Sequence, residues 1–216
     1  MQQAKNVLCQ LQENPQLRQY VDFTLPIPQP YQGTQEIKLI VLGQDPTVKN
    51  APSRKNIKTV LNLDRNGSVY AYLIQVCNEL GIRLDENVYA TNLYKNFFIH
   101  PPTQITEIDI FSTFIGYWLP LLQEELKPFA DVPIITLGEP ILAPLVSGAS
   151  VKVRDYWGYT THWKLSKSKP FGYIKPEQNF LNHLIFPFPH QPSLRKQFYK
   201  TYLSKYTAFA RAIAFS

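Results

Sequence analysis

The sequence predicts an α/β protein, folded as a three-layer αβα sandwich around a mostly parallel four-stranded sheet. Short apolar runs rich in Val, Ile and Leu alternate with longer segments of helical periodicity, which is typical of strands joined by crossover helices. The 216 residues, of which 44% are apolar, suffice to bury one core. We therefore expect a single domain over 1–216, with an N-terminal helical extension over 1–35 and an irregular basic and aromatic insert over 151–180.

Four short runs have the composition of strands: three are mainly apolar, as in buried parallel strands, and the run over 87–92 has an apolar centre between polar residues. They span 37–42, 87–92, 133–138 and 184–186. A short helix within 6–20, interrupted by Pro15, and a Pro-rich crossing over 26–30 precede the first run.

Longer segments with apolar residues three or four positions apart predict the first two helices between these strands. One spans 67–81, with Ser68 as its N-cap and Gly81 at its end. The other spans 108–126 and is expected to bend at Pro120.

Two more helices are expected nearer the C-terminus. One starts at Glu139 after the third run, and the other spans 193–214 and is capped by Ser193. With helices between the strands, the carboxyl ends of the strands meet at one edge of the sheet. Ligands bind at that edge in open α/β sheets, so the residues after each run are the first candidates for a functional site.

The composition excludes several classes of protein. Cys9 and Cys77 are the only cysteines, too few for a disulfide framework or a four-cysteine metal or iron–sulfur site, and we expect neither metal nor cofactor. No apolar run approaches the roughly 20 residues of a membrane helix, and the N-terminus does not resemble a signal peptide. We expect a cytoplasmic monomer without membrane contact, and the net charge of +6 favours a polyanionic partner.

Polar side chains follow three of the predicted strands. Residues 43–47 read Gly-Gln-Asp-Pro-Thr, residues 91–95 read Thr-Asn-Leu-Tyr-Lys, and residues 189–193 read Pro-His-Gln-Pro-Ser. Taken singly, the three segments are explained by local structure: an Asp-Pro turn, an Asn that ends a strand, and a Pro-shaped loop with a surface histidine. Taken together, they bring a carboxylate, an amide and an imidazole to one edge of the sheet.

These three segments together resemble the uracil-DNA glycosylase superfamily. Residues 43–46 match its Gly-Gln-Asp-Pro motif, residues 88–95 are similar to the second strand of its iron–sulfur branch, and the loop around His190 resembles its catalytic His-Pro loop. The order of elements holds over roughly residues 36–205. The resemblance implies a monofunctional DNA glycosylase, which removes a base from DNA and leaves an abasic site without a cofactor.

The sequence departs from the family pattern around the base. Gln191 separates His190 from the next proline, and the cysteines of the iron–sulfur branch are missing. Thr47 replaces the Tyr that closes off C5 of uracil, and residues 59–64 include Asn62 but no aromatic residue to stack on a base. The expected target is therefore uracil or a C5-modified cytosine, glucosylated hydroxymethylcytosine included, in DNA repair or in defence against phage.

The resemblance also implies roles for individual residues. Asp45 would stabilise the cationic sugar and position the attacking water, and His190 would donate to O2 of the departing pyrimidine. The residues expected to contact the base are Gln44, Thr47, Asn92 and Asn62.

DNA is the expected partner, held by basic and polar residues close to these motifs. They are Lys49, Arg54, Lys55, Lys95, Ser193, Leu194 and Arg195. Two alternatives stay open. The inserted Gln191 favours a catalytically inactive DNA-binding protein on the same fold. A nucleoside or nucleotide hydrolase would instead bind its substrate with little dependence on salt.

Overall fold

The chain forms a five-stranded sheet with the order β1-β3-β2-β4-β5 in a computed structural model that describes residues 2–158 and 170–215. Strands β2 to β5 are parallel to their neighbours, and β1 pairs antiparallel with β3 at one edge. The strands are β1 (Tyr31–Gln32), β2 (Leu39–Gly43), β3 (Val88–Asn92), β4 (Ile134–Leu137) and β5 (Ile185–Phe188). The predicted mixed α/β fold with a mostly parallel sheet is confirmed, but the sheet has five strands instead of four.

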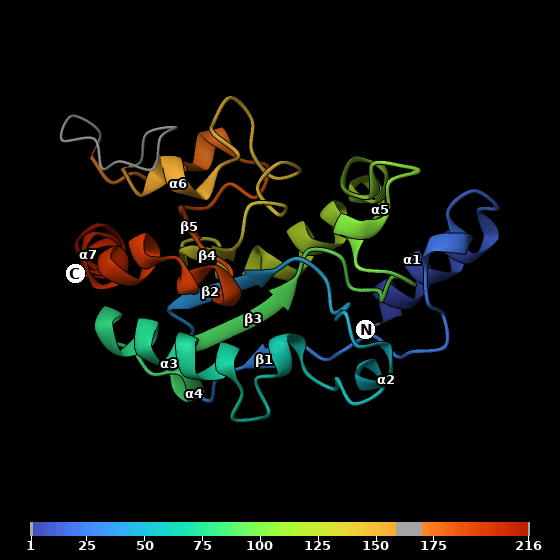
Figure 1. Cartoon of the computed structure of the whole chain (residues 1–216), viewed down its shortest axis with the longest axis horizontal. Helices are drawn as coiled ribbons and strands as arrows, with labels where there is room; N and C mark the ends of the chain where they lie inside the picture. Colours follow the sequence, from blue (N-terminus) through green and yellow to red (C-terminus); the bar gives the residue numbers. More distant parts are fainter. Residues whose placement is uncertain (1, 159–169, 216) are drawn as a thin grey trace.

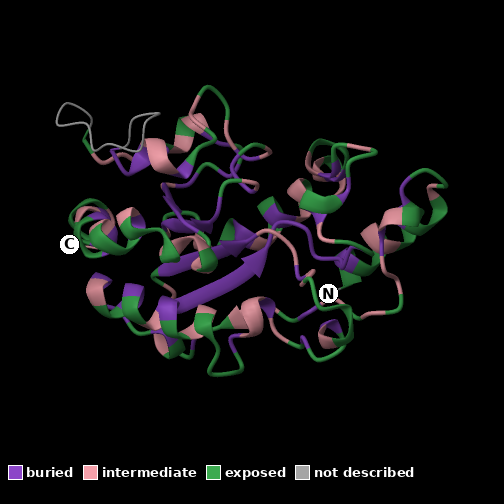
Figure 2. Ribbon diagram, in the orientation of Figure 1, coloured by how far each residue is buried: buried purple, intermediate pink, exposed green. Residues whose placement is uncertain are grey.

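The four parallel strands are the ones that the sequence predicts from short runs with apolar centres, although β3 ends on the polar residues Thr91 and Asn92. All residues of β2 to β5 are buried, as the colouring of the strands in Figure 2 shows. The additional strand β1 has two residues, one half-buried and one exposed, and so lacks the apolar run that identifies the others.

Helices cover the sheet. The α-helices are α1 (Gln2–Glu13), α2 (Ala51–Arg54), α3 (Ser68–Leu80), α4 (Leu84–Asn87), α5 (Ile110–Leu126), α6 (Val153–Tyr156) and α7 (Gln197–Ala214). Short 3₁₀ turns occur at Arg18–Tyr20, Val60–Asn62, Pro102–Gln104, Lys127–Phe129, Pro176–Gln178 and Gln191–Arg195. In Figure 1 α7 lies to the left of the strands and its partner α3 below them, and α1 and α5 lie to the right, consistent with a three-layer sandwich.

Helices α3 and α5 lie where the sequence predicts them, but the N-cap of α3 differs from the expected one. Helix α3 stops at Gly81, whose φ of 82° is the left-handed conformation that glycine adopts most readily. Its N-cap position is Gly67 instead of Ser68, and no side chain caps it. Helix α5 begins after Asp109, whose Oδ1 accepts hydrogen bonds from two backbone amides, and Pro120 lies within the helix.

Three predicted helix boundaries are wrong. The segment after β4, from Glu139 onward, forms turns instead of a helix. The closing helix α7 starts after Lys196, because Ser193 belongs to the preceding 3₁₀ turn and does not cap it. Helix α1 begins at Gln2 and ends at Glu13, before Pro15, since proline interrupts helical hydrogen bonding.

The described residues of the expected insert over 151–180 include one that packs into the core. Trp157 follows α6 and is fully buried, with its ring stacked on Tyr206 of α7 at a centroid distance of 4.4 Å. Its indole N–H donates to the carbonyl of Pro187 at 2.8 Å. The basic and aromatic part at 159–169 lies outside the described residues.

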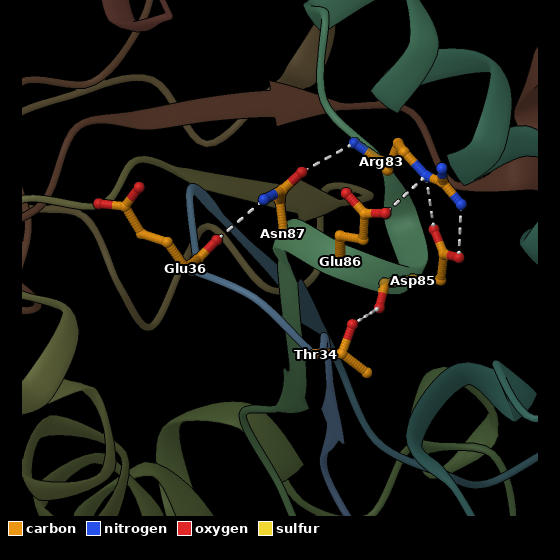
Figure 3. Close-up of polar contacts among 6 residues, drawn as sticks. All are labelled: Thr34, Glu36, Arg83, Asp85, Glu86 and Asn87. Atoms are coloured by element: carbon orange, nitrogen blue, oxygen red, sulfur yellow. Dashed lines mark hydrogen bonds and ion pairs between the residues drawn. The ribbon is translucent and has the colours of Figure 1, made fainter.

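An exposed polar network fixes the entry into β2 and β3 (Figure 3). Arg83 pairs with Asp85 at 3.0 Å and with Glu86 at 3.2 Å, and the Asn87 amide donates to the Glu36 carbonyl at 3.0 Å. The ion pairs stay within residues 83–86 and, being exposed, contribute little to stability, whereas the hydrogen bond from Asn87 to Glu36 and that from the Thr34 hydroxyl to the Asp85 carbonyl join the segments that lead into β2 and β3. The network lies at the amino end of the strands, away from their carboxyl ends.

Candidate active site at the carboxyl ends of the strands

The ends of β2 and β3 lie side by side. Gly43, the last residue of β2, is paired in register with Asn92, the last residue of β3. Beyond the strands, the Leu93 amide donates to the Gly43 carbonyl and the Tyr94 amide to the Gln44 carbonyl, both at 2.9 Å. This extended pairing brings the segment that carries Asp45 next to Asn92, as the sequence predicts.

Asn92 is buried, and its amide group is unsatisfied. Its relative exposure is 1%, and neither its Nδ2 nor its Oδ1 has a hydrogen-bond partner among the described residues. Leaving a buried polar group unpaired costs about 1–3 kcal/mol, so such a group calls for a functional explanation. A Cβ atom on Gly43 would collide with Asn92 Oδ1, so only glycine leaves room for this amide.

Asp45 is held by its neighbours in a half-buried position. Its Oδ1 accepts from the Thr47 backbone amide at 2.7 Å and its Oδ2 from Gln44 Nε2 at 2.6 Å. Burial raises the pKa of this carboxyl to about 6, even though both hydrogen bonds lower it. A carboxyl group with this pKa exchanges protons near neutral pH, which suits acid–base chemistry.

Thr47 and Arg54 tie the loop after β2 to the segment after β3. Thr47 Oγ1 accepts from the Phe98 amide at 2.8 Å. The Arg54 side chain is 4% exposed and donates to the carbonyls of Val48, Phe98 and Ile99, each at 2.9 Å. The expected DNA contact by Arg54 is therefore wrong, because the side chain is buried and its Nε and Nη1 donors are engaged inside the protein.

Leu61 is a neighbour of the site that sequence reasoning missed. Leu61 and Asn62 have φ values of 57° and 53°, which are uncommon for residues other than glycine. The atoms nearest to a Cβ on Gly43 belong to Asn92 and to Leu61, whose Cδ2 lies 3.0 Å away, and not to the expected Asn62. No sequence signal marks this, because leucine rarely adopts the left-handed conformation.

His190 lies in the loop after β5, close to the end of β4. Gly138, directly after β4, has a φ of 98°, and a Cβ atom on it would lie 3.4 Å from His190 Cβ. The residue is exposed, but the protein around its ring lowers its pKa because partial burial disfavours the imidazolium. The sheet order thus places the amide, the carboxyl and the imidazole along one edge, after β3, β2 and β5.

A cavity of about 260 Å³ lies beside His190. Its charged and hydroxyl-bearing walls include Glu139, Arg154, Ser193 and Lys196, from the loop after β4, α6, the 3₁₀ turn and the start of α7. Asp45 and Asn92 do not line it. The candidate residues therefore fall into two groups at the carboxyl ends of the strands, a tight cluster around Gly43 and a cavity next to His190.

Lys95 is the second basic residue whose expected role is wrong. It is 6% exposed, its Nζ pairs with Glu125 and donates to Thr91, and burial lowers its pKa. The Tyr89 hydroxyl donates to the other oxygen of Glu125 at 2.7 Å. Lys95 therefore closes a buried network beneath the sheet edge and is not available to a phosphate.

The other expected DNA-contacting residues lie at or near the surface. Lys49, Lys55 and Arg195 are exposed, and Ser193 and Leu194 are half-buried in the 3₁₀ turn after His190. Over the described ranges 2–158 and 170–215, no cluster of three or more His, Cys, Asp or Glu side chains is arranged to hold a metal ion. No helix in that part of the chain is both long and apolar enough to cross a bilayer.

Comparison of the sequence with protein-family models and with curated proteins found no match.

Proposed function

We propose that this protein is a DNA glycosylase that hydrolyses the N-glycosidic bond of a flipped-out pyrimidine and leaves an abasic site. The observation that carries the proposal is the buried, unpaired amide of Asn92 beside Gly43, two residues before Asp45. An amide offers one acceptor and two donors, which complement the hydrogen-bonding edge of a pyrimidine. A base that enters this place would satisfy the amide and thereby recover the free energy lost by burying it unpaired.

Asp45 has the properties that the sugar side of the reaction requires. When the bond between C1′ and N1 breaks, its electron pair leaves with the base and the sugar becomes cationic. The Asp45 carboxylate stabilises that cation and orients the water whose oxygen bonds to C1′. The water proton passes to the carboxylate or to solvent, for which the pKa of about 6 is well matched.

His190 acts on the departing base. Its lowered pKa leaves the ring neutral near pH 7, and a neutral imidazole can still donate one N–H. That N–H donates to O2 of the pyrimidine, where negative charge develops. Loss of a donor of this kind typically slows a reaction by about 10²–10³.

Gly43 and Leu61 shape the proposed base-binding site next to the Asn92 amide. Extruding a nucleotide costs a few kcal/mol, so the pocket must offer compensating contacts. Leu61 gives an apolar contact next to the Asn92 amide, in a stretch without the aromatic residue that the resemblance leads one to expect. The Thr47 side chain is smaller than the tyrosine of the family pattern, and its hydroxyl oxygen accepts a hydrogen bond from the Phe98 backbone amide. Uracil and a C5-modified cytosine therefore remain the two candidate bases.

The DNA backbone would be held around the cavity beside His190. Arg154 and Lys196 line that cavity, and exposed Arg195 adjoins it in sequence. Positive side chains and hydroxyl groups such as that of Ser193 are the usual partners of phosphate oxygens. Lys49 and Lys55, which are exposed and follow Asp45 in the sequence, are further candidates for phosphate contacts.

Abasic-site formation on defined DNA tests the proposal. Matched duplex and single-stranded oligonucleotides carry uracil, cytosine, 5-hydroxymethylcytosine or glucosylated 5-hydroxymethylcytosine at one position, and alkali-sensitive breaks are scored. We expect breaks at one of the modified positions with the wild type, and at least a 100-fold lower rate with Asp45→Asn and with His190→Ala. The matched control is Asp131→Asn, at an exposed turn residue before β4, which leaves the rate unchanged.

The outcomes separate the candidate functions. Breaks at uracil alone indicate a repair enzyme, and breaks at a modified cytosine indicate defence against phage DNA. Tight, salt-sensitive binding without breaks would replace the proposal by the inactive DNA-binding protein. Cleavage of free nucleosides with little salt dependence would replace it by the nucleoside hydrolase.

A further inference from the structure

The loop that carries His190 is held through its carbonyl groups. Pro187, Pro189 and Pro192 have no backbone N–H, so this segment has few donors and is fixed mainly through its acceptors. Each of the four successive carbonyls from Pro187 to His190 accepts a hydrogen bond from a different place in the chain. The donors, in order along the loop, are Trp157 Nε1 (2.8 Å), the Gly138 amide (2.8 Å), the Tyr72 hydroxyl (3.2 Å) and the Ser193 amide (2.7 Å).

Tyr72 holds the carbonyl directly before His190. The residue lies on α3 and is 4% exposed, and Pro189 is buried, so water does not readily replace the hydroxyl. Burial also raises the pKa of Tyr72 well above its ordinary value. The phenol therefore stays protonated and donates at neutral pH.

We propose that Tyr72 is a positioning residue, which sets the place of the His190 imidazole by binding the Pro189 carbonyl. The part of this inference that concerns catalysis rests on the proposed function, in which His190 donates to the departing base. Without the hydroxyl, the Pro189 carbonyl is buried and unpaired, and the loop gains by moving toward water. Because His190 follows that carbonyl immediately and packs close to Gly138, such a movement displaces its ring.

Tyr72→Phe tests this role, since it removes the hydroxyl and keeps the ring in the core. The matched control is Tyr70→Phe on the same helix, because the Tyr70 hydroxyl makes no hydrogen bond to the described residues. The first readout is the titration of His190 followed by NMR in the free protein, with its signals assigned by their loss in His190→Ala. Both variants retain Glu139, Arg154, Lys196 and Tyr199, the ionisable neighbours of His190 around the cavity.

We expect the pKa of His190 to rise toward its ordinary value in Tyr72→Phe, as the ring moves away from the protein atoms that partly bury it, and to stay unchanged in Tyr70→Phe. The second readout is the single-turnover rate on the DNA that the wild type cleaves. Loss of one hydrogen bond predicts a rate lower by up to about 10-fold, with the dissociation constant for DNA within twofold of the wild type.

An unchanged His190 titration in Tyr72→Phe overturns the positioning role whatever the activity. A shifted titration with an unchanged rate overturns its catalytic part. If the wild type cleaves none of the DNAs, the proposed function fails, whereas the titration still decides whether Tyr72 places His190. Melting curves of both variants separate these effects from loss of folded protein.

Discussion

The surroundings of Asp45 disfavour its ionised form, and this has a measurable consequence for the stability of the protein. The folded state holds its pKa at about 6, above the ordinary value of 3.8, so folding favours the protonated form. Its contribution is fully favourable below about pH 4 and is lost as the pH rises through 6. We expect Asp45→Asn to stabilise the protein by about 1–3 kcal/mol at pH 8 and to have little effect at pH 4. Urea unfolding at both values measures this, and equal stability at pH 8 would contradict the assigned burial.

Gly43 illustrates how one missing side chain makes room for a functional one. In Gly43→Ala the new methyl group meets Asn92 Oδ1 and Leu61 Cδ2, so the amide must turn away from its place. We expect the cleavage rate to fall by about 10–100-fold, since base recognition loses one or two hydrogen bonds. Gly116→Ala is the control, because a Cβ atom there meets nothing and alanine favours the helix. Equal rates for the two variants would show that Asn92 does not read the base.

At the scale of the elements, the strands can be predicted from the sequence because they depend on local composition. The roles of single residues that depend on tertiary contacts cannot. Strands β2 to β5 were foreseen from their composition, and so was the approach of Asp45 to Asn92. The roles of Arg54 and Lys95 were not, because no local pattern distinguishes a buried basic residue from an exposed one. The turn that brings Leu61 over Gly43 was also missed, since its left-handed residues contradict local preference.

The Arg54 contacts give a prediction about the two loops that they join. Arg54→Met would leave the carbonyls of Val48, Phe98 and Ile99 without their donor, the Phe98 carbonyl at a buried contact and the other two at partly buried ones. We expect the free energy of unfolding to fall by about 2–4 kcal/mol, measured by urea titration. Arg65→Met is the matched control, since Arg65 is exposed and donates to one carbonyl, and it should cost less than about 1 kcal/mol. A similar loss in both variants would mean that Arg54 does not fasten the loops.

At the scale of the whole molecule, the net charge of +6 matters through its placement. If Lys49, Lys55 and Arg195 bind phosphates, each removes condensed cations from DNA, and the logarithm of affinity falls with the logarithm of salt by about 0.9 per contact. We therefore expect Lys49→Gln, Lys55→Gln and Arg195→Gln each to reduce that slope by about one. Lys38→Gln, which removes an equal charge before β2 at the opposite end of the strand from Asp45, should leave it unchanged. Fluorescence anisotropy of labelled DNA from 50 to 300 mM salt measures the slopes. Equal small changes in all four variants would show that overall charge, and not a surface around the site, attracts the DNA.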